Sequence, residues 1–79
     1  MKVEARLFGT YRQRFPDYQP SQGMEVELPD GATVRDLLAL LGLSESRGAV
    51  VIAGGRVLGA DERLLRGVPV NVMQAIGGG

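Results

Sequence analysis

The first part of the chain alternates between apolar and charged residues. Apolar side chains occupy every second position of residues 2–7. This period of two predicts a strand with one buried face. Phe8 then falls on the polar side of the alternation, so we expect its side chain to be exposed. Residues 24–28 repeat the pattern and predict a second strand, which the turn-forming Pro-Asp-Gly at 29–31 ends.

A helical pattern follows this turn. Apolar residues are spaced i, i+3, i+4 and i+7 over residues 34–41, which gives one stripe that can pack on a sheet. Thr33 is placed as an N-cap, and Asp36 stands where its reciprocal partner in a capping box belongs. Gly42 occupies the position of a left-handed C-terminal cap. We therefore expect an amphipathic helix of about ten residues, with Leu43 packing back on its last turn.

Three more strands are predicted in the second half of the chain. Residues 49–53 are a short β-branched run, which is typical of a central buried strand. The glycine pair at 54–55 favours a tight hairpin, with a short return strand at 56–58. Residues 68–76 are predicted to form the last strand, with its proline tolerable only at its start or on an edge.

The segments between these elements carry apolar side chains that can complete the core. Residues 10–23 contain two prolines and read as a loop, with a turn of helix around residues 11–15. We expect Phe15 and Tyr18 to fold back on the core as a lid. The leucine pair at 64–65 is predicted to fill the core from a second short segment.

The order of elements predicts an α+β fold. One helix must cover one face of a mixed four- to five-stranded sheet, because the predicted elements include no other layer that could pack on it. We expect the first and last strands to run parallel at the centre of the sheet, which is the ubiquitin-like β-grasp arrangement. Residues 1–76 would then form the domain, and residues 77–79 a flexible C-terminal glycine tail.

Composition narrows the classes of function. Nine basic and nine acidic residues give no net charge, so the chain lacks the basic footprint of a nucleic-acid binder. It contains no cysteine and no histidine, which removes the thiolate nucleophile, the commonest metal ligand and the usual general base. We expect no enzymatic activity, no bound metal and no bound cofactor. The early charges and short apolar runs predict neither a signal peptide nor a membrane span, so we expect a cytoplasmic protein. We also expect it to be a monomer when free.

The glycines at 77–79 are the main chemical candidate. Glycine packs no side chain and loses more backbone entropy on ordering than any other residue, so we expect this end to stay mobile and exposed. A thin tail ending in a carboxylate suits an enzyme that must grip and activate a protein's C-terminus. The alternative is a frayed end without function.

Several stretches together resemble one known family, the β-grasp sulfur carriers, which include the molybdopterin synthase small subunit and the thiamine-pathway sulfur carrier (the MoaD/ThiS group). The matching stretches are residues 3–8 with Tyr11-Arg12, residues 25–38, the glycine-rich hairpin after Ile52, and the Gly78-Gly79 end. The long segment at 10–23 resembles the molybdopterin branch more than the thiamine branch.

The resemblance implies a function for the Gly79 carboxylate. A partner adenylating enzyme of the E1 type, using ATP and magnesium, would activate it, and a sulfur donor protein would convert it to a thiocarboxylate. The sulfur would then serve cofactor synthesis, molybdopterin ahead of thiamine, in the first case with a large-subunit synthase as partner. Gly77 and Gly78 would let the tail enter a narrow channel in the partner, since any Cβ there would collide with its walls.

The partner must also contact the folded domain, because three extended residues reach only about 10 Å. Phe8 and Met73 are predicted to face away from the core on adjacent strands near the tail. With Ile76 they are the candidate partner-binding residues of the folded domain. Isolated exposed apolar side chains are also ordinary on protein surfaces. Two other functions remain open: a ubiquitin-like modifier that is joined to lysine through the same carboxylate, and an interaction module with an inert tail.

Overall fold

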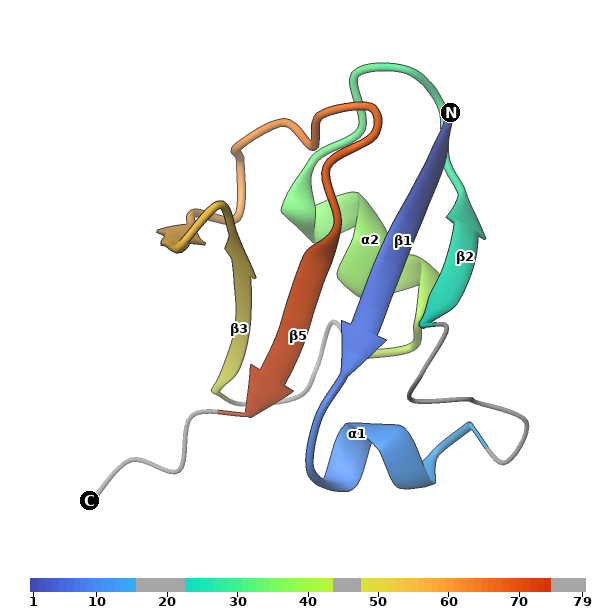
Figure 1. Cartoon of the computed structure of the whole chain (residues 1–79), viewed down its shortest axis with the longest axis vertical. Helices are drawn as coiled ribbons and strands as arrows, with labels where there is room; N and C mark the ends of the chain where they lie inside the picture. Colours follow the sequence, from blue (N-terminus) through green and yellow to red (C-terminus); the bar gives the residue numbers. More distant parts are fainter. Residues whose placement is uncertain (16–22, 44–47, 75–79) are drawn as a thin grey trace.

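The computed structural model of the chain describes residues 1–15, 23–43 and 48–74. In these residues the strands and helices follow one another in the order predicted from the sequence (Figure 1). They are β1 (Lys2–Leu7), α1 (Thr10–Gln13), β2 (Met24–Glu27), α2 (Val34–Leu40), β3 (Ala49–Ala53), β4 (Arg56–Leu58) and β5 (Val70–Gln74). No helix among them is long and apolar enough to cross a membrane.

The strands form one mixed sheet in the order β2-β1-β5-β3-β4. β1 and β5 run parallel, with Ala5 opposite Val70 and Leu7 opposite Val72, while the other neighbours are antiparallel. The predicted parallel pairing of the first and last strands is therefore confirmed. Since β5 is the central strand, the chain reaches its last described residue, Gln74, from the middle of the sheet (Figure 1).

α2 packs on one face of the sheet, and its two ends have the predicted caps. The Thr33 N–H donates to Asp36 Oδ2 at 2.9 Å, and the Asp36 N–H donates to Thr33 Oγ1 at 3.3 Å, which completes the capping box. Gly42 has a φ of 74°, and the N–H of the fully buried Leu43 donates to the Leu38 carbonyl at 2.7 Å. α2 spans seven residues rather than about ten, because Leu41 already serves as its C-cap.

The core lies between α2 and the sheet. It contains the alternate residues of β1, the matching residues of the neighbouring strands and the apolar stripe of α2. Its members are Val3, Ala5, Leu7, Tyr11, Val26, Leu28, Ala32, Val34, Leu37, Leu41, Leu43, Val51, Leu64, Val70 and Val72. The predicted turn of helix is present as α1, and Phe15 packs against the core as expected. Tyr18 lies outside the described residues.

Two predictions about buried side chains were wrong. In β3 only Val51 is fully buried, because it is the residue that lies opposite the core residue Val72. Its neighbours Val50 and Ile52 therefore face away from α2. Of the leucine pair, Leu64 is buried and Leu65 is 65% exposed. The Leu64 N–H donates to the Ala32 carbonyl at 2.8 Å, which ties this position to the core and turns the next side chain outward.

The last strand is shorter than predicted at its start. It begins at Val70 rather than at Val68, since Pro69 has no N–H to donate to a neighbouring strand. Val70 and Val72 are buried and Asn71 and Met73 are half-buried, so Met73 lies on the face away from the core, as predicted.

Candidate functional site

The predicted site residues Ile76, Gly77, Gly78 and Gly79 lie outside the described residues. The structure describes the surface that precedes them. The carboxyl ends of β1 and β5 lie side by side because the two strands are parallel, and α1 follows directly after β1 (Figure 1). Gln74, the last described residue, lies at this end of the domain.

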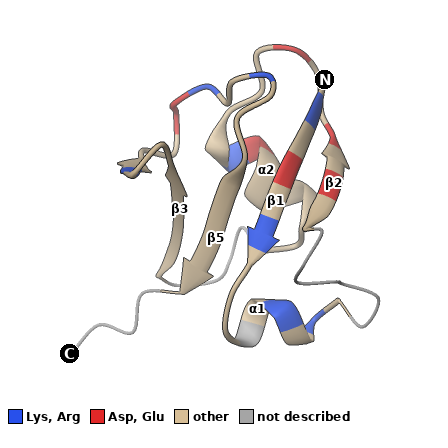
Figure 2. Ribbon diagram, in the orientation of Figure 1, with Lys and Arg blue, Asp and Glu red and all other residues tan. Residues whose placement is uncertain are grey.

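The sheet face opposite α2 is divided into a charged half and a mostly apolar half, which also contains Asn71 opposite Ile52. β1 and β2 contain Lys, Arg and Glu residues, whereas β3 and β5 contain no charged residue (Figure 2). In the charged half, Lys2 Nζ lies 3.2 Å from Glu25, and Arg6 Nε donates to Glu4 at 2.8 Å. The apolar half includes the strand that leads toward the glycines.

Phe8 and Met73 lie on this face at adjacent positions. Leu7 is opposite Val72 in the parallel ladder, and the Phe8 N–H donates to the Val72 carbonyl at 3.1 Å, so Phe8 and Met73 occupy the next position of the two strands. Phe8 is 44% exposed, as the alternation predicts, and Met73 is half-buried.

Three further apolar residues extend this surface across the sheet. Val50 is opposite Met73, and Ile52 pairs with Val57 on the edge strand β4. Val57 is 59% exposed, and the two β3 side chains are half-buried. We call Phe8, Val50, Ile52, Val57 and Met73 the apolar patch. Its β3 and β4 members were not predicted from the sequence. Had Val51 been assigned to the core, the alternation of side chains along a strand would have placed Val50 and Ile52 on this face.

Basic side chains of α1 lie at the same end of the domain. Arg12 of α1 and Arg14, the C-cap residue that follows the helix, are both exposed. α1 contacts β5, and Figure 2 marks basic residues in this helix. The Arg14 guanidinium lies 6.0 Å from the centre of the Tyr11 ring, whose burial anchors the helix. Arg6, by contrast, already has Glu4 as its partner. This end therefore offers an apolar surface with cationic groups beside it.

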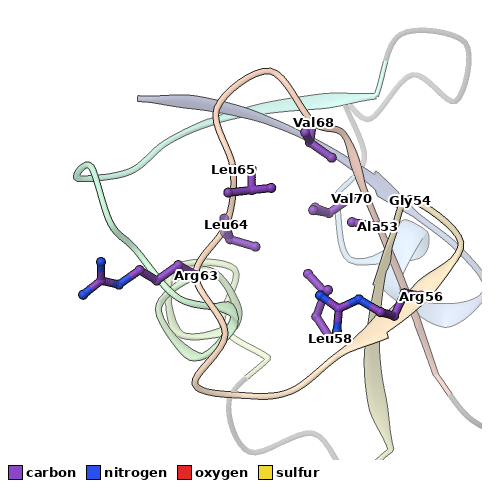
Figure 3. Close-up of a pocket in the computed structure, with 9 residues that line it drawn as sticks. All are labelled: Ala53, Gly54, Arg56, Leu58, Arg63, Leu64, Leu65, Val68 and Val70. Atoms are coloured by element: carbon purple, nitrogen blue, oxygen red, sulfur yellow. The ribbon is translucent and has the colours of Figure 1, made fainter.

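A hollow of about 340 Å³ lies at the opposite end of β5. Its walls are mostly apolar and come from the β3–β4 hairpin and the segment before β5, with Arg56 and Arg63 at its rim (Figure 3). Val70, the first residue of β5, lines it, so the hollow and Gln74, the last described residue, lie at opposite ends of that strand.

The charges beside this hollow stabilise a turn. Arg56 donates to both carboxylate oxygens of Glu62, at 3.0 and 2.7 Å, and the Gly59 N–H donates to Glu62 at 3.0 Å. The hydrogen bonds from Arg56 and then from Gly59 lower the pKa of Glu62 to about 2. In the part of the chain that the structure covers, no group of three acidic, histidine or cysteine side chains is placed to hold a metal ion.

Comparisons with known proteins agree with this architecture. The model of the ThiS family matches residues 5–79. A Pyrococcus furiosus protein described as molybdopterin converting factor, subunit 1, is similar over 94% of this chain and 97% of its own, with 26% identity and a TM-score of 0.73. SAMP1 from Haloferax volcanii is similar over 100% of both chains (24% identity, TM-score 0.69). A second structure, H. volcanii small archaeal modifier protein 1, covers 92% of this chain and 95% of its own (18% identity, TM-score 0.68).

These likenesses confirm the β-grasp fold. None of the curated proteins matches the chain.

Proposed function

The chain belongs to the ThiS family, and from this membership we propose that it is a sulfur carrier that acts through the carboxylate of Gly79. Members of this family are small carrier proteins rather than catalysts, and they act with E1-like enzymes and synthase partners. The observation that carries the proposal is that the family match runs through residue 79 and so includes the three glycines.

The proposed chemistry needs two steps, because a carboxylate is a poor acyl donor. In the first, a Gly79 carboxylate oxygen attacks the α-phosphorus of ATP, and magnesium pyrophosphate leaves. In the second, hydrosulfide supplied by the donor protein attacks the acyl carbon, AMP leaves, and a thiocarboxylate remains. Sulfur is then carried on the main chain, which suits a protein without cysteine. Magnesium and ATP belong to the adenylating enzyme.

We assign the apolar patch to the contact with that enzyme. The glycines offer no side chains to recognise, whereas Phe8 and Met73 stand where β1 and β5 end, directly before the tail. Apolar side chains that are half-buried or exposed in the free domain gain most when a partner covers them. The exposed Arg12 on α1 is suited to pair with an acidic group of the same partner.

The pathway we favour is molybdopterin synthesis, with thiamine synthesis next. The P. furiosus protein that resembles this chain over nearly its whole length is described as a molybdopterin converting factor. The long segment between β1 and β2 points the same way. In this pathway a large-subunit synthase would accept the sulfur, and all the steps would take place in the cytoplasm.

A second candidate function is that of a ubiquitin-like modifier. The H. volcanii modifier SAMP1 is similar to this chain along the full length of both. In that function a lysine amine, rather than a sulfide, attacks the acyl adenylate, and an isopeptide bond to Gly79 results. The two functions share the first step and differ only in the nucleophile.

Alkylation and mass analysis of the protein purified from its own cell would test the proposal. Because the chain contains no cysteine, iodoacetamide at neutral pH should label the thiocarboxylate selectively, and the label should map to the C-terminal peptide. A variant lacking Gly79 is the control and should stay unlabelled. Lysine-linked conjugates without labelling would favour the modifier. If removing Gly79 impaired neither cofactor synthesis nor conjugation, both functions would be refuted.

A further inference from the structure

The edge strand β2 has main-chain groups that no neighbouring strand uses. Among the described residues, β2 is the last strand on its side of the sheet and pairs only with β1. Just beyond it, the Leu28 N–H donates to the Met1 carbonyl at 2.8 Å, and the Met1 ammonium donates to the Leu28 carbonyl at 2.5 Å. Met1 and Leu28 are therefore a hydrogen-bonded pair of this antiparallel ladder.

The register extends this pattern along the strand. Hydrogen-bonded and non-hydrogen-bonded pairs alternate in an antiparallel ladder. Val26 opposite Val3 is then the next bonded pair, while Glu25 and Glu27 occupy non-bonded positions. The N–H and C=O groups of Glu25 and Glu27 consequently point away from β1, toward the free edge. They offer two donors and two acceptors to another extended chain.

An apolar groove runs beside this edge on the α2 side. It has a volume of about 430 Å³ and lies between β2 and α2. Met24, Val26, Phe15 and Leu41 line it, together with Leu40, whose side chain is 58% exposed. An extended chain added to β2 would direct every second side chain into this groove.

The other face of the same edge is acidic. Glu25 and Glu27 are exposed there, and β2 carries no basic residue (Figure 2). Glu25 has Lys2 within 3.2 Å, whereas Glu27 has no ion pair with any other residue that the structure describes. In an antiparallel pair of two β2 edges related by a two-fold axis, glutamates would stand opposite glutamates, which is unfavourable. The charges thus disfavour a second copy of the chain as the occupant.

We propose that the β2 edge and its groove bind an extended segment of a partner protein in which apolar residues alternate with lysine or arginine. Its main chain pairs with the Glu25 and Glu27 backbone, and its apolar side chains enter the groove against Leu40. Its basic side chains lie opposite the two glutamates on the other face. This binding needs no activation of Gly79 and stands apart from the sulfur-carrier proposal.

Titration of the full chain, labelled with ¹⁵N, with the capped peptide Lys-Val-Lys-Val-Lys-Val tests the proposal. We expect the largest amide shifts at Glu25, Glu27 and the Leu40 turn. A peptide with glutamate in place of lysine should bind at least about tenfold more weakly, because like charges would then face each other across the new strand pair. A peptide methylated on the amide nitrogens that face β2 should not bind.

Charge reversal gives the sharpest comparison. In the double variant Glu25→Lys and Glu27→Lys, we expect the preference to invert, so that the glutamate peptide binds more tightly than the lysine peptide. The matched control is Asp61→Lys, an exposed acid away from β2 that pairs with Arg35, and it should keep the original preference. Leu40→Ala retains a good helix former at an exposed position and should weaken both peptides.

Three results would overturn the proposal. The first is no binding of the lysine peptide at millimolar concentration to the wild-type chain. The second is a set of shifts centred on β4, the other edge strand, instead of β2. The third is an unchanged preference in the charge-reversed variant, provided that thermal unfolding shows the variant to be folded.

Discussion

Replacing Phe8 with alanine should weaken recognition by the adenylating enzyme. The Phe8 side chain is 44% exposed in the free domain. A phenylalanine buries about 200 Å² when fully covered, so a partner that covers the exposed part removes about 90 Å² of apolar surface from water. At about 25 cal/mol per Å², this contact contributes about 2 kcal/mol, or about thirtyfold in affinity.

The assay is ATP–pyrophosphate exchange catalysed by the adenylating enzyme, with the chain as the varied substrate. We expect KM for Phe8→Ala to rise by about thirtyfold while kcat stays close to that of the wild type, because the carboxylate itself is untouched. The part of the ring already buried contributes to folding, so denaturant unfolding must show that the variant is folded under the assay conditions.

Leu65→Ala is the matched control. Leu65 is more exposed than Phe8, at 65%, but it lines the hollow at the far end of β5. Its removal should leave KM unchanged. An unchanged KM for Phe8→Ala, or an equal rise for both variants, would refute the assignment of the apolar patch to this contact.

Three further predictions concern folding and are checked by urea unfolding. Leu43→Ala should destabilise the domain by about 2–5 kcal/mol, because this side chain is fully buried; a loss below about 1 kcal/mol would contradict that packing. Thr33→Ala removes the capping hydrogen bond to Asp36 and should cost about 1 kcal/mol. Glu62, with its pKa lowered from 4.5 to about 2, stabilises the fold above pH 4.5 and loses this contribution as the pH falls toward 2. The stability of the Glu62→Gln variant should therefore fall less than that of the wild type as the pH is lowered from 4.5 toward 2. Identical profiles of stability against pH for the two proteins would refute the pairing of Glu62 with Arg56.

Local sequence signals were sufficient where one segment determines its own structure. The alternation in residues 2–7 predicted both the strand and its buried face. Thr33, Asp36 and Gly42 predicted the start and the end of α2, because capping depends on residues within one turn of each other. The glycines at 54 and 55 have φ values of 59° and 76°, as the predicted hairpin requires.

Burial that depends on distant partners was less predictable. Residues 49–53 are all apolar, so the sequence contains no alternation to show which side faces α2, and only the register with β5 decides it. The burial of Tyr11 likewise follows from the packing of α1 near β5, which is remote in sequence. The β3 members of the apolar patch were missed for this reason, whereas Phe8 was predicted from its place next to a clear alternation.

In the proposed function, the position of β5 joins the domain and its tail into one substrate. β5 is the central strand, it contributes Met73 to the apolar patch, and residues 75–79 continue directly from it. A partner that holds the patch therefore holds the strand from which the tail departs. The five residues after Gln74 span at most about 18 Å, so the partner's catalytic groups must lie within that distance of the end of β5. In the proposed function the three glycines carry no side chain and supply only reach and access, so selectivity among proteins with glycine tails must come from Ile76 and the folded face.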